Sequence, residues 1–586
     1  MDVERILRDK HSGDNEQLDF IFSNEKRIIV TAPAGCGKTT AMISKIAREL
    51  CVGTIPGNKK VLAMTFSVNA AMRIKDDVKK LLPEIVNTPQ TLLNRIDIAN
   101  YHNFAMRLLH KYGYILNNNL TNLSCFQILD DSKLINLGLL TFSEEVNVNK
   151  LGEAIINGNY AELCAAIDTY WDILDNKLIS NSIITYNGIL VAAIKLLSLK
   201  PVSDFYSIYY KMIIIDEFQD TNLLGFLLID KLISNNIAIF LGDDVQKIYG
   251  FLGAINNALE TVSEKYQAKS ILFKTNYRFR NNERMKQLDS FIRGYVENYR
   301  SSDNNATLLL KKLNTDNGEI DFISKGVEKI VGTTCNVAVL VRAGWQGKSI
   351  VSRFEEKGIH FFNALYTETD AEYINFYRIA VEEFHANALG KAVKSSLDKC
   401  LKAVKVRENE VYSDIEKKYI FDSLYKLLGK LFEVSRSWDG TSKERYSNID
   451  FNLSNNGLKH MMEYLDEKVV LTTIHSAKGL EWDYVILPQM NASIFPSWRY
   501  VCKPCHDVNG CNLGYDYCVN KFLPEMKRII TEEMSAFYVA LTRAKKEVFV
   551  TVNTGKNQHG YVKQTNCFIN LPGLLHQDFN WDDYII

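Results

Sequence analysis

The sequence predicts an α/β protein with two domains, each built on a parallel sheet and each carrying a mostly helical insertion. Short apolar runs alternate along the chain with segments whose apolar residues recur at helical spacing. This pattern is typical of parallel strands that are covered by helices on both faces. Two such series occur, and each is interrupted by a long stretch of helical character. With 586 residues, the chain is long enough to form several hydrophobic cores.

The first series lies in the first half of the chain. Apolar runs that predict strands stand at 27–32, 61–65, 212–215 and 237–241. Between the first two runs, apolar residues from Thr39 to Leu50 recur at helical spacing and predict a helix. From about 100 to about 190 the sequence is helical and rich in asparagine, without clear strands. It therefore predicts an inserted helical subdomain.

The second series follows the same plan in the second half of the chain. Its strands are predicted at 337–341, 469–473, 484–487 and 548–552. A helical block rich in lysine and glutamate, from about 365 to about 465, interrupts it. The regular alternation in both series predicts open parallel sheets, whose ligands bind at the carboxyl ends of the strands.

Composition excludes several classes of protein. Lys+Arg and Asp+Glu both number 69, so the formal net charge is zero. This excludes a globally basic nucleic-acid binder but leaves room for a local basic channel. The 11 cysteines are mostly scattered and do not resemble a disulfide framework. No signal-peptide pattern opens the sequence and no apolar run approaches the length of a membrane span, so we expect a soluble, cytoplasmic protein.

A phosphate-binding loop is predicted directly after the first strand. The segment reads Ala32, Pro33, Ala34, Gly35, Cys36, Gly37, Lys38, Thr39 and Thr40. It fits the P-loop, except that alanine stands at 32 in place of the first glycine. The glycines let the backbone curl so that several N–H groups converge on a phosphate, and the following helix adds its positive end. A glycine-rich turn with a chance Lys-Thr pair is the alternative, which the flanking strand and helix disfavour.

An acidic pair supplies the partner of this loop. The apolar run at 212–215 delivers Asp216 and Glu217 at its carboxyl end. We expect Lys38 to reach the β- and γ-phosphates, and Thr39 and Asp216 to hold Mg²⁺. Glu217 is the candidate general base that polarises the attacking water. Together the two motifs predict a nucleoside triphosphatase.

Five further segments occur in a fixed order along the chain. They read DEFQDTN at 216–222, GDDVQKIYGFLGA at 242–254, TNYR at 275–278, TIHSAKGLEWD at 473–483 and YVALTRAKK at 538–546. Weaker matches stand at Gln17, 65–67, 101–104, 337–342 and 567–572. Together these segments resemble the UvrD/Rep/PcrA-like helicases of superfamily 1, over essentially the whole chain outside the two insertions.

The resemblance implies two RecA-like motor domains with ATP in the cleft between them. It implies 3′→5′ movement on single-stranded DNA, with strand separation as the usual consequence. The implied domains are 1–100 with 185–274, and 275–364 with 466–586. The implied insertions are 101–184 and 365–465, the second being a reduced accessory insertion.

Roles of individual residues follow from the matching positions. The resemblance implies that Gln17 reads the adenine edge, Tyr277 stacks on adenine, Glu481 binds ribose and Gln246 senses the γ-phosphate. It further implies that Arg278 and Arg543, both placed in the second motor domain, reach the γ-phosphate. Their guanidinium groups would neutralise charge in the transition state as an arginine finger does. For a single arginine, a surface salt bridge is the alternative.

Positions beside the DNA strand are also implied. They are Phe66, His102, Tyr249, Phe251 and His475. Aromatic rings suit a motor that tolerates any sequence, because every base offers a π-face. Core packing is the alternative interpretation for each aromatic residue.

Three departures from the family pattern bear on unwinding. Leu252 stands where the family usually has arginine, and Val68-Asn69 replaces the usual Asn-Lys. The block 365–465 is also short for an accessory domain that contacts duplex DNA. Translocation is therefore the firmer expectation. The alternative is a nucleic-acid-gated ATPase switch that regulates a partner effector, such as a nuclease. For either activity the sequence leaves the pathway open between DNA repair, replication restart, plasmid maintenance and phage defence.

A cysteine cluster near the end of the chain permits a zinc site. Its members are Cys502, Cys505, Cys511 and Cys518, with His506 beside them. A CxxC hook followed by two further ligands suits tetrahedral zinc, although the second pair is spaced wider than in common zinc ribbons. Buried or free thiols are the alternative.

Overall fold

The computed structural model describes residues 3–584 apart from 67, 135–136, 249, 251–252, 256, 299–304, 368–369, 439–440, 455–456, 493, 498–500, 502–523, 557–559 and 561. The chain divides into two compact units, Met1–Arg278 and Phe279–Ile586. The division falls after Arg278 rather than after residue 274. As a result, Tyr277 and Arg278 belong to the same unit as the P-loop.

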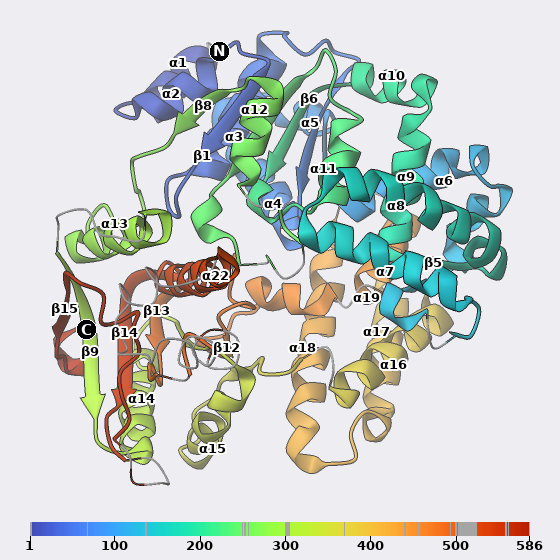
Figure 1. The fold of residues 1–586 in the computed structure, drawn as a ribbon. Coiled ribbons are helices and arrows are strands. Elements are labelled where there is room, and N and C mark those ends of the chain that lie inside the picture. The colour runs from blue at the N-terminus through green and yellow to red at the C-terminus, as the bar shows by residue number, and fades with distance from the viewer. Residues whose placement is uncertain are drawn as a thin grey trace. The chain divides into compact units, whose positions relative to one another are not determined.

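Unit 1 is built on a parallel sheet of six strands in the order β3-β2-β6-β7-β1-β8. Its strands are β1 (Arg27–Thr31), β2 (Lys60–Thr65), β3 (Ile96–Asn100), β6 (Tyr210–Asp216), β7 (Ile237–Gly242) and β8 (Lys269–Leu272). Strands from distant parts of the sequence, blue and green in Figure 1, lie side by side in this sheet. Because all six run the same way, β1 and β6 end at the same edge, where open sheets bind their ligands.

Two apolar layers enclose this sheet. Along β6, Met212 and Ile214 join one core cluster, whereas Ile213 and Ile215 join the other. Successive side chains of a strand point to opposite faces, so a strand buried on both faces must be apolar throughout. The first layer contains residues of α1 (Val3–Lys10), α2 (Asn15–Phe22), α3 (Lys38–Cys51), α4 (Val68–Ile85) and α5 (Pro89–Leu93).

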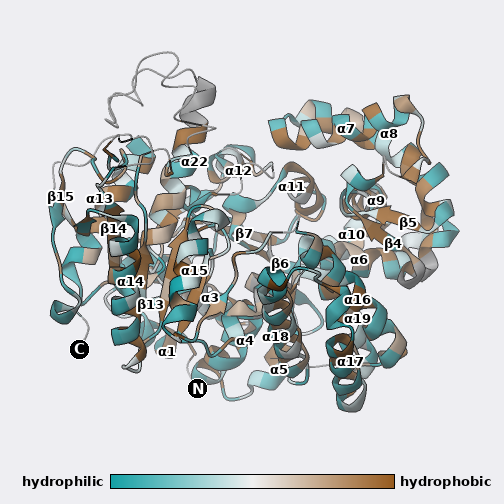
Figure 2. Cartoon of the chain, turned by 90° about the horizontal axis from the view of Figure 1, so that it is seen from below, coloured by the Kyte–Doolittle hydropathy of each residue, from teal (hydrophilic) through white to brown (hydrophobic). Residues whose placement is uncertain are grey.

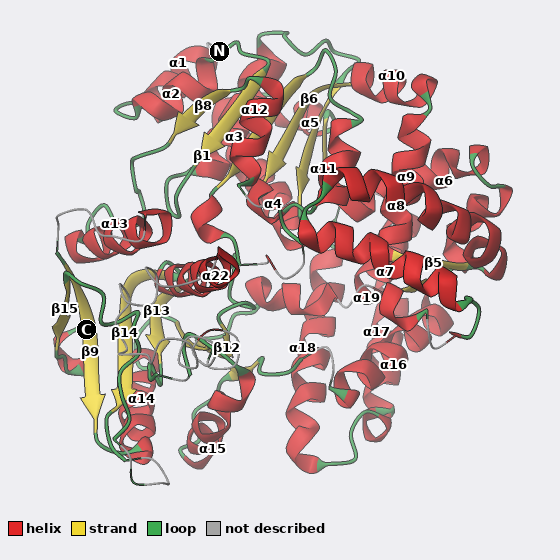
Figure 3. Ribbon diagram, viewed as in Figure 1, coloured by secondary structure: helices red, strands yellow, loops and turns green. Residues whose placement is uncertain are grey.

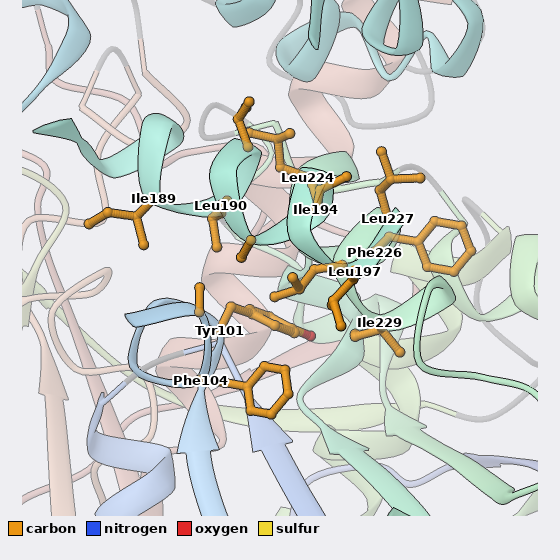
Figure 4. Packing of buried hydrophobic residues seen from close by; sticks show 14 of the residues in the cluster. Tyr101, Phe104, Ile189, Leu190, Ile194, Leu197, Leu224, Phe226, Leu227 and Ile229 are labelled. Atoms are coloured by element: carbon orange, nitrogen blue, oxygen red, sulfur yellow. The ribbon is translucent and has the colours of Figure 1, made fainter. Parts of the chain in front are cut away.

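The other layer merges with the helical insertion of unit 1. The helices of this layer are α6 (Tyr101–Tyr112), α7 (Phe142–Asn157), α8 (Tyr160–Ile173), α9 (Tyr186–Ser198), α10 (Lys200–Tyr209), α11 (Leu223–Asp230) and α12 (Ala258–Tyr266). Figure 4 shows Leu190 and Ile194 of α9 lying beside Leu224 and Leu227 of α11 and above Tyr101 of α6. The insertion therefore shares one continuous core with the sheet.

Helix α7 shows how the insertion is held. Its buried residues Val148, Leu151, Ala154 and Ile155 recur at three- and four-residue spacing, and hydrophobic and hydrophilic segments alternate along it in Figure 2. A capping box formed by Thr141 and Glu144 begins the helix, which satisfies backbone donors that the first turn leaves open.

Unit 2 has a second parallel sheet, of seven strands in the order β11-β12-β10-β13-β14-β9-β15. Its strands are β9 (Ala306–Leu313), β10 (Val337–Val341), β11 (Phe362–Asn363), β12 (Val469–Thr473), β13 (Trp482–Leu487), β14 (Ala544–Asn553) and β15 (Leu574–Gln577). Its helices include α13 (Glu283–Asn298), α14 (Asp316–Val331), α15 (Lys348–Glu356) and α22 (Pro524–Leu541). Between β11 and β12 the described chain is helical (Figure 3), through α16 (Ala371–Ala388), α17 (Lys394–Val406), α18 (Lys418–Ser435) and α19 (Ser442–Ser454).

The predicted fold class is confirmed: two parallel sheets, each interrupted by a mostly helical insertion. The prediction that the first insertion lacks strands was wrong, because the short strands β4 (Gln127–Leu129) and β5 (Ile183–Thr185) form a parallel pair there. These three-residue strands are too short to show an apolar run in the sequence. Among the described helices, none combines the length and apolarity needed to cross a membrane.

Candidate active site

The predicted P-loop connects β1 to α3 in the structure. Gly35 and Gly37 have φ values of 80° and 72°, in the left-handed region that favours glycine. Gly37 stands at the N-cap of α3 without a side-chain cap, so the first turn of the helix presents backbone N–H groups at the loop. Thr39 and Thr40 lie in this first turn. The loop and helix end thus have the form of an anion-binding site.

Lys38 meets both predicted acids in the structure. Its Nζ lies 3.0 Å from Asp216 Oδ1 and donates a hydrogen bond to the Glu217 carboxylate. Burial opposes the positive charge, but the two carboxylates outweigh it and raise the pKa of Lys38. Burial also raises the pKa of Asp216, against the opposing effect of Lys38. The sheet therefore places one cation and two acids at a single edge, although they are far apart in sequence.

Glu217 is held in an unusual conformation. Its φ is 52°, a left-handed value that is uncommon outside glycine. Gln219 Nε2 donates to Glu217 Oε2 at 2.6 Å. Backbone strain of this kind persists only where the surroundings enforce it, and it clusters at functional sites.

A chain of hydrogen bonds continues from Gln219 to the end of β7. Gln219 Oε1 accepts from the backbone N–H of Asp243 at 3.0 Å, and Gln246 Nε2 donates to Asp243 Oδ2 at 2.8 Å. Glu217 and Gln246, two predicted site residues, are therefore linked through two residues that were not predicted from the sequence. The signal for Gln219 was its position inside the DEFQDTN segment.

The residues assigned to adenine lie beside the P-loop. Gln17 Nε2 donates to the Cys36 carbonyl at 2.9 Å. The Tyr277 N–H donates to the Gly35 carbonyl at 2.9 Å, and its hydroxyl donates to Asp14 Oδ2 at 2.8 Å. A Cβ placed on Gly37 would lie 2.8 Å from Gln17 Nε2, so only glycine permits this approach.

Arg278 also lies against the loop. A Cβ placed on Gly35 would lie 2.6 Å from the Cβ of Arg278 and 2.8 Å from Asn276 Oδ1. Asn276 Nδ2 donates to the Ala34 carbonyl at 3.2 Å. Within unit 1, the structure thus brings together the P-loop, the acidic pair and the TNYR segment.

Arg543 and Glu481 belong to unit 2. Arg543 follows α22 and is buried; its guanidinium donates to the Val539 carbonyl at 3.0 Å and to the Leu480 carbonyl at 3.3 Å. Its own carbonyl accepts from the N–H of Trp482 at 3.0 Å. These bonds fix Arg543 next to Glu481, which is half-buried.

Three of the predicted DNA-contacting residues can be placed. Phe66 follows β2 and packs in part against the core. His102 lies in α6, with its ring edge-on to Tyr186 at 5.9 Å, and its Nε2 is buried with no hydrogen-bond partner among the described residues. Burial lowers its pKa to about 4. Burial, helped by Arg342 and Lys478, likewise lowers the pKa of His475 to about 4.

The remaining predictions lie outside the described residues. These are Tyr249, Phe251 and Leu252, and the cysteines Cys502, Cys505, Cys511 and Cys518. Within the described part of the chain, no group of three or more histidine, cysteine or acidic side chains is arranged to hold a metal ion. Zinc at the cysteine cluster stays a hypothesis.

Comparison with known proteins assigns the family. The model of the UvrD/REP helicase N-terminal domain matches residues 14–267, and that of the UvrD-like helicase C-terminal domain matches residues 365–555. DNA helicase II of Rickettsia typhi is 24% identical over 640 residues, covering 92% of each chain. ATP-dependent DNA helicase PcrA of Staphylococcus aureus is 22% identical over 653 residues, covering 93% of this chain and 84% of its own.

These matches agree with the geometry of the first sheet. Both family models, taken together, span most of the chain, in the order that the motifs predict. Their N-terminal match contains the P-loop, the acidic pair and the chain of hydrogen bonds to Gln246. The chain belongs to the UvrD-like family of ATP-hydrolysing DNA helicases.

Proposed function

We propose that this helicase moves 3′→5′ on single-stranded DNA and hydrolyses ATP where its two motor domains meet. The observation that best supports the catalytic part is the contact of Lys38 with Asp216 and Glu217 at one sheet edge. A lysine, a candidate magnesium ligand and a candidate base are the parts that phosphoryl transfer to water requires.

The P-loop residues fit a nucleoside triphosphate with its metal ion. Gly35 and Gly37 have φ values of 80° and 72°, which let backbone N–H groups of the loop converge on a phosphate, and Thr39 adds a hydroxyl in the first turn of α3. Thr39 and Asp216 would hold Mg²⁺, which neutralises phosphate charge when bound. Lys38 would bind the β- and γ-phosphates, for which it must leave the carboxylates.

Glu217 then acts as the general base. Its ion pair with Lys38 lowers its tendency to take a proton, so withdrawal of Lys38 by the phosphates activates it. The 2.6 Å hydrogen bond from Gln219 orients one oxygen of Glu217. Gln219 is also linked to Gln246 by hydrogen bonds through Asp243. Arg278 and Arg543 supply guanidinium groups to the transferring phosphoryl group, by analogy with arginine fingers.

DNA contacts are proposed at Phe66, His102, Tyr249, Phe251 and His475. Because the pKa values of His102 and His475 are about 4, both rings are neutral near pH 7. They therefore suit stacking on a base or a single hydrogen bond rather than an ion pair with a phosphate. Ion pairs with the DNA phosphates would have to be made by other, cationic side chains.

The test compares ATP hydrolysis with strand displacement. Hydrolysis is measured with and without single-stranded DNA for the wild type, Lys38→Ala and Lys26→Ala; Lys26 is an exposed lysine just before β1 and serves as the matched control. Displacement is measured on duplexes with a 3′ or a 5′ single-stranded tail. DNA-stimulated hydrolysis that only Lys38→Ala abolishes, with release of the 3′-tailed strand, supports the proposal.

Two results would contradict it. Release of only the 5′-tailed strand would reverse the direction. DNA-stimulated hydrolysis without movement on single strands would favour the alternative, an ATPase switch that regulates a partner effector.

A further inference from the structure

A buried histidine adjoins the residue assigned to adenine. His11 lies between α1 and α2 and is 4% exposed. Its Nδ1 is 2.5 Å from Gln17 Oε1, and its Nε2 is 2.8 Å from the hydroxyl of Ser44 on α3. Gln17 and Ser44 are buried as well. None of the motifs that identify the family includes His11.

The direction of each hydrogen bond in this group can be derived. The Cys36 carbonyl only accepts, so the amide end of Gln17 that faces it must be Nε2. Oε1 therefore faces His11, and since Oε1 also only accepts, His11 Nδ1 must carry a proton. Burial lowers the pKa of His11, so the ring is neutral near pH 7. Its Nε2 then accepts from the Ser44 hydroxyl.

This arrangement fixes which way round the Gln17 amide stands. Its two ends are nearly equal in size, so packing alone does not distinguish them. A backbone carbonyl at one end and an imidazole N–H at the other hold Nε2 toward the P-loop and Oε1 away from it. Each end keeps further capacity, because Nε2 has a second hydrogen and Oε1 a second lone pair.

We propose that His11 is a positioning residue that fixes the amide of Gln17 and thereby the preference of this site for 6-amino over 6-oxo purine nucleotides. The inference rests on the proposed contact of Gln17 with the base. Adenine offers a donor at N6 and an acceptor at N7, which match Oε1 and Nε2. Guanine offers acceptors at both O6 and N7. An Oε1 that is held toward O6 faces another acceptor and cannot form a hydrogen bond with it. An amide that turns freely can instead direct Nε2 toward O6, so it binds guanine better.

The experiment measures kcat/KM for ATP and for GTP in the presence of single-stranded DNA. His11→Phe keeps a planar ring and removes the donor, whereas His11→Asn restores an N–H near the position of Nδ1. We expect His11→Phe to lower the ATP-to-GTP ratio about tenfold through KM, with kcat little changed, within the discrimination that a bidentate base contact provides. His11→Asn should retain most of the ratio. His110→Phe, at an exposed histidine of α6, is the matched control and should leave the ratio unchanged.

The outcomes separate this inference from the proposed function. If Gln17→Ala does not alter the ratio, the contact of Gln17 with the base is wrong. If Gln17→Ala lowers the ratio and a folded His11→Phe does not, the inference about His11 alone is overturned. Nitrogen NMR of labelled histidine in the wild-type protein, assigned with His11→Asn, gives a second test: a proton on Nε2 rather than Nδ1 would overturn the inference.

Discussion

Replacing Gly35 by alanine tests the approach of the TNYR segment to the P-loop. The Cβ of the new residue would lie 2.6 Å from the Cβ of Arg278 and 2.8 Å from Asn276 Oδ1. Arg278 Cβ is attached directly to the backbone, so it cannot turn aside as the end of a long side chain can. The segment 276–278 must therefore move away from the loop.

The expected loss of stability has two parts. The φ of Gly35 is 80°, where an L-residue costs about 1–2 kcal/mol. Overpacking adds about 1–3 kcal/mol. Gly53 isolates the first part, because its φ is 83° and no described atom lies within 4 Å of its added Cβ. We expect a loss of about 1–2 kcal/mol for Gly53→Ala and about 2–5 kcal/mol for Gly35→Ala.

Urea unfolding of the two variants measures this difference. The gain from a less flexible unfolded chain is the same for both glycine-to-alanine changes, so it cancels in the comparison. The rate of ATP hydrolysis should fall at least about tenfold in Gly35→Ala, since a loss of about 1.4 kcal/mol in positioning corresponds to that factor. In Gly53→Ala the rate should stay at the wild-type value. Equal unfolding free energies for the two variants would refute the reasoning.

Three further predictions concern single residues. His102→Phe should remove an acid-induced loss of stability, because the pKa of His102 is about 4 in the folded chain against an ordinary value of 6.5. The free energy of unfolding of the wild type should therefore fall as the pH drops from 6.5 toward 4, by about 2 kcal/mol at pH 5. If urea unfolding shows the same loss between pH 7 and pH 5 in both proteins, this prediction is wrong. Gly326→Ala places a Cβ 2.3 Å from the Trp581 ring and should destabilise by about 1–3 kcal/mol. In a Trp581→Leu background, the better helix propensity of alanine should make the same change neutral or stabilising in thermal unfolding. Glu217→Gln should bind ATP in a nucleotide titration yet hydrolyse it about 10²–10⁴-fold more slowly, and normal turnover would exclude Glu217 as the base.

The interior strands other than β9 were predictable from the sequence, whereas the edge strands were not. β1, β2, β6 and β7 of the first sheet, and β10, β12, β13 and β14 of the second, each gave a continuous apolar run. The edge strands β3, β8, β11 and β15 did not. In β15, three of the four residues are exposed, because an edge strand is only partly covered and needs no such run. β9 was also missed, although it lies inside its sheet.

The candidate site shows the same division between local and distant signals. Lys38, Asp216 and Glu217 were predictable because each lies in a motif with fixed local spacing. Gln219 lies in the same DEFQDTN segment as Glu217, but its contact with Asp243 could not be predicted from that segment. His11 lies in no motif, and its contacts with Gln17 and with Ser44 on another helix form only on folding. No spacing rule in a single sequence encodes such pairs.

In the proposed mechanism, the contact of Lys38 with Glu217 makes the action of the base depend on the nucleotide. A carboxylate paired with a lysine is a poor proton acceptor, since the neighbouring cation favours its charged form. Only a ligand with enough negative charge at the P-loop can draw Lys38 away, and a nucleotide with few phosphates competes less well with two carboxylates. If Lys38 binds the phosphates as proposed, the same lysine holds Glu217 in an ion pair when they are absent. Gln219 donates to Oε2 of Glu217, whereas Lys38 contacts Oε1, so in this mechanism Gln219 can keep Glu217 oriented when the lysine moves to the phosphates.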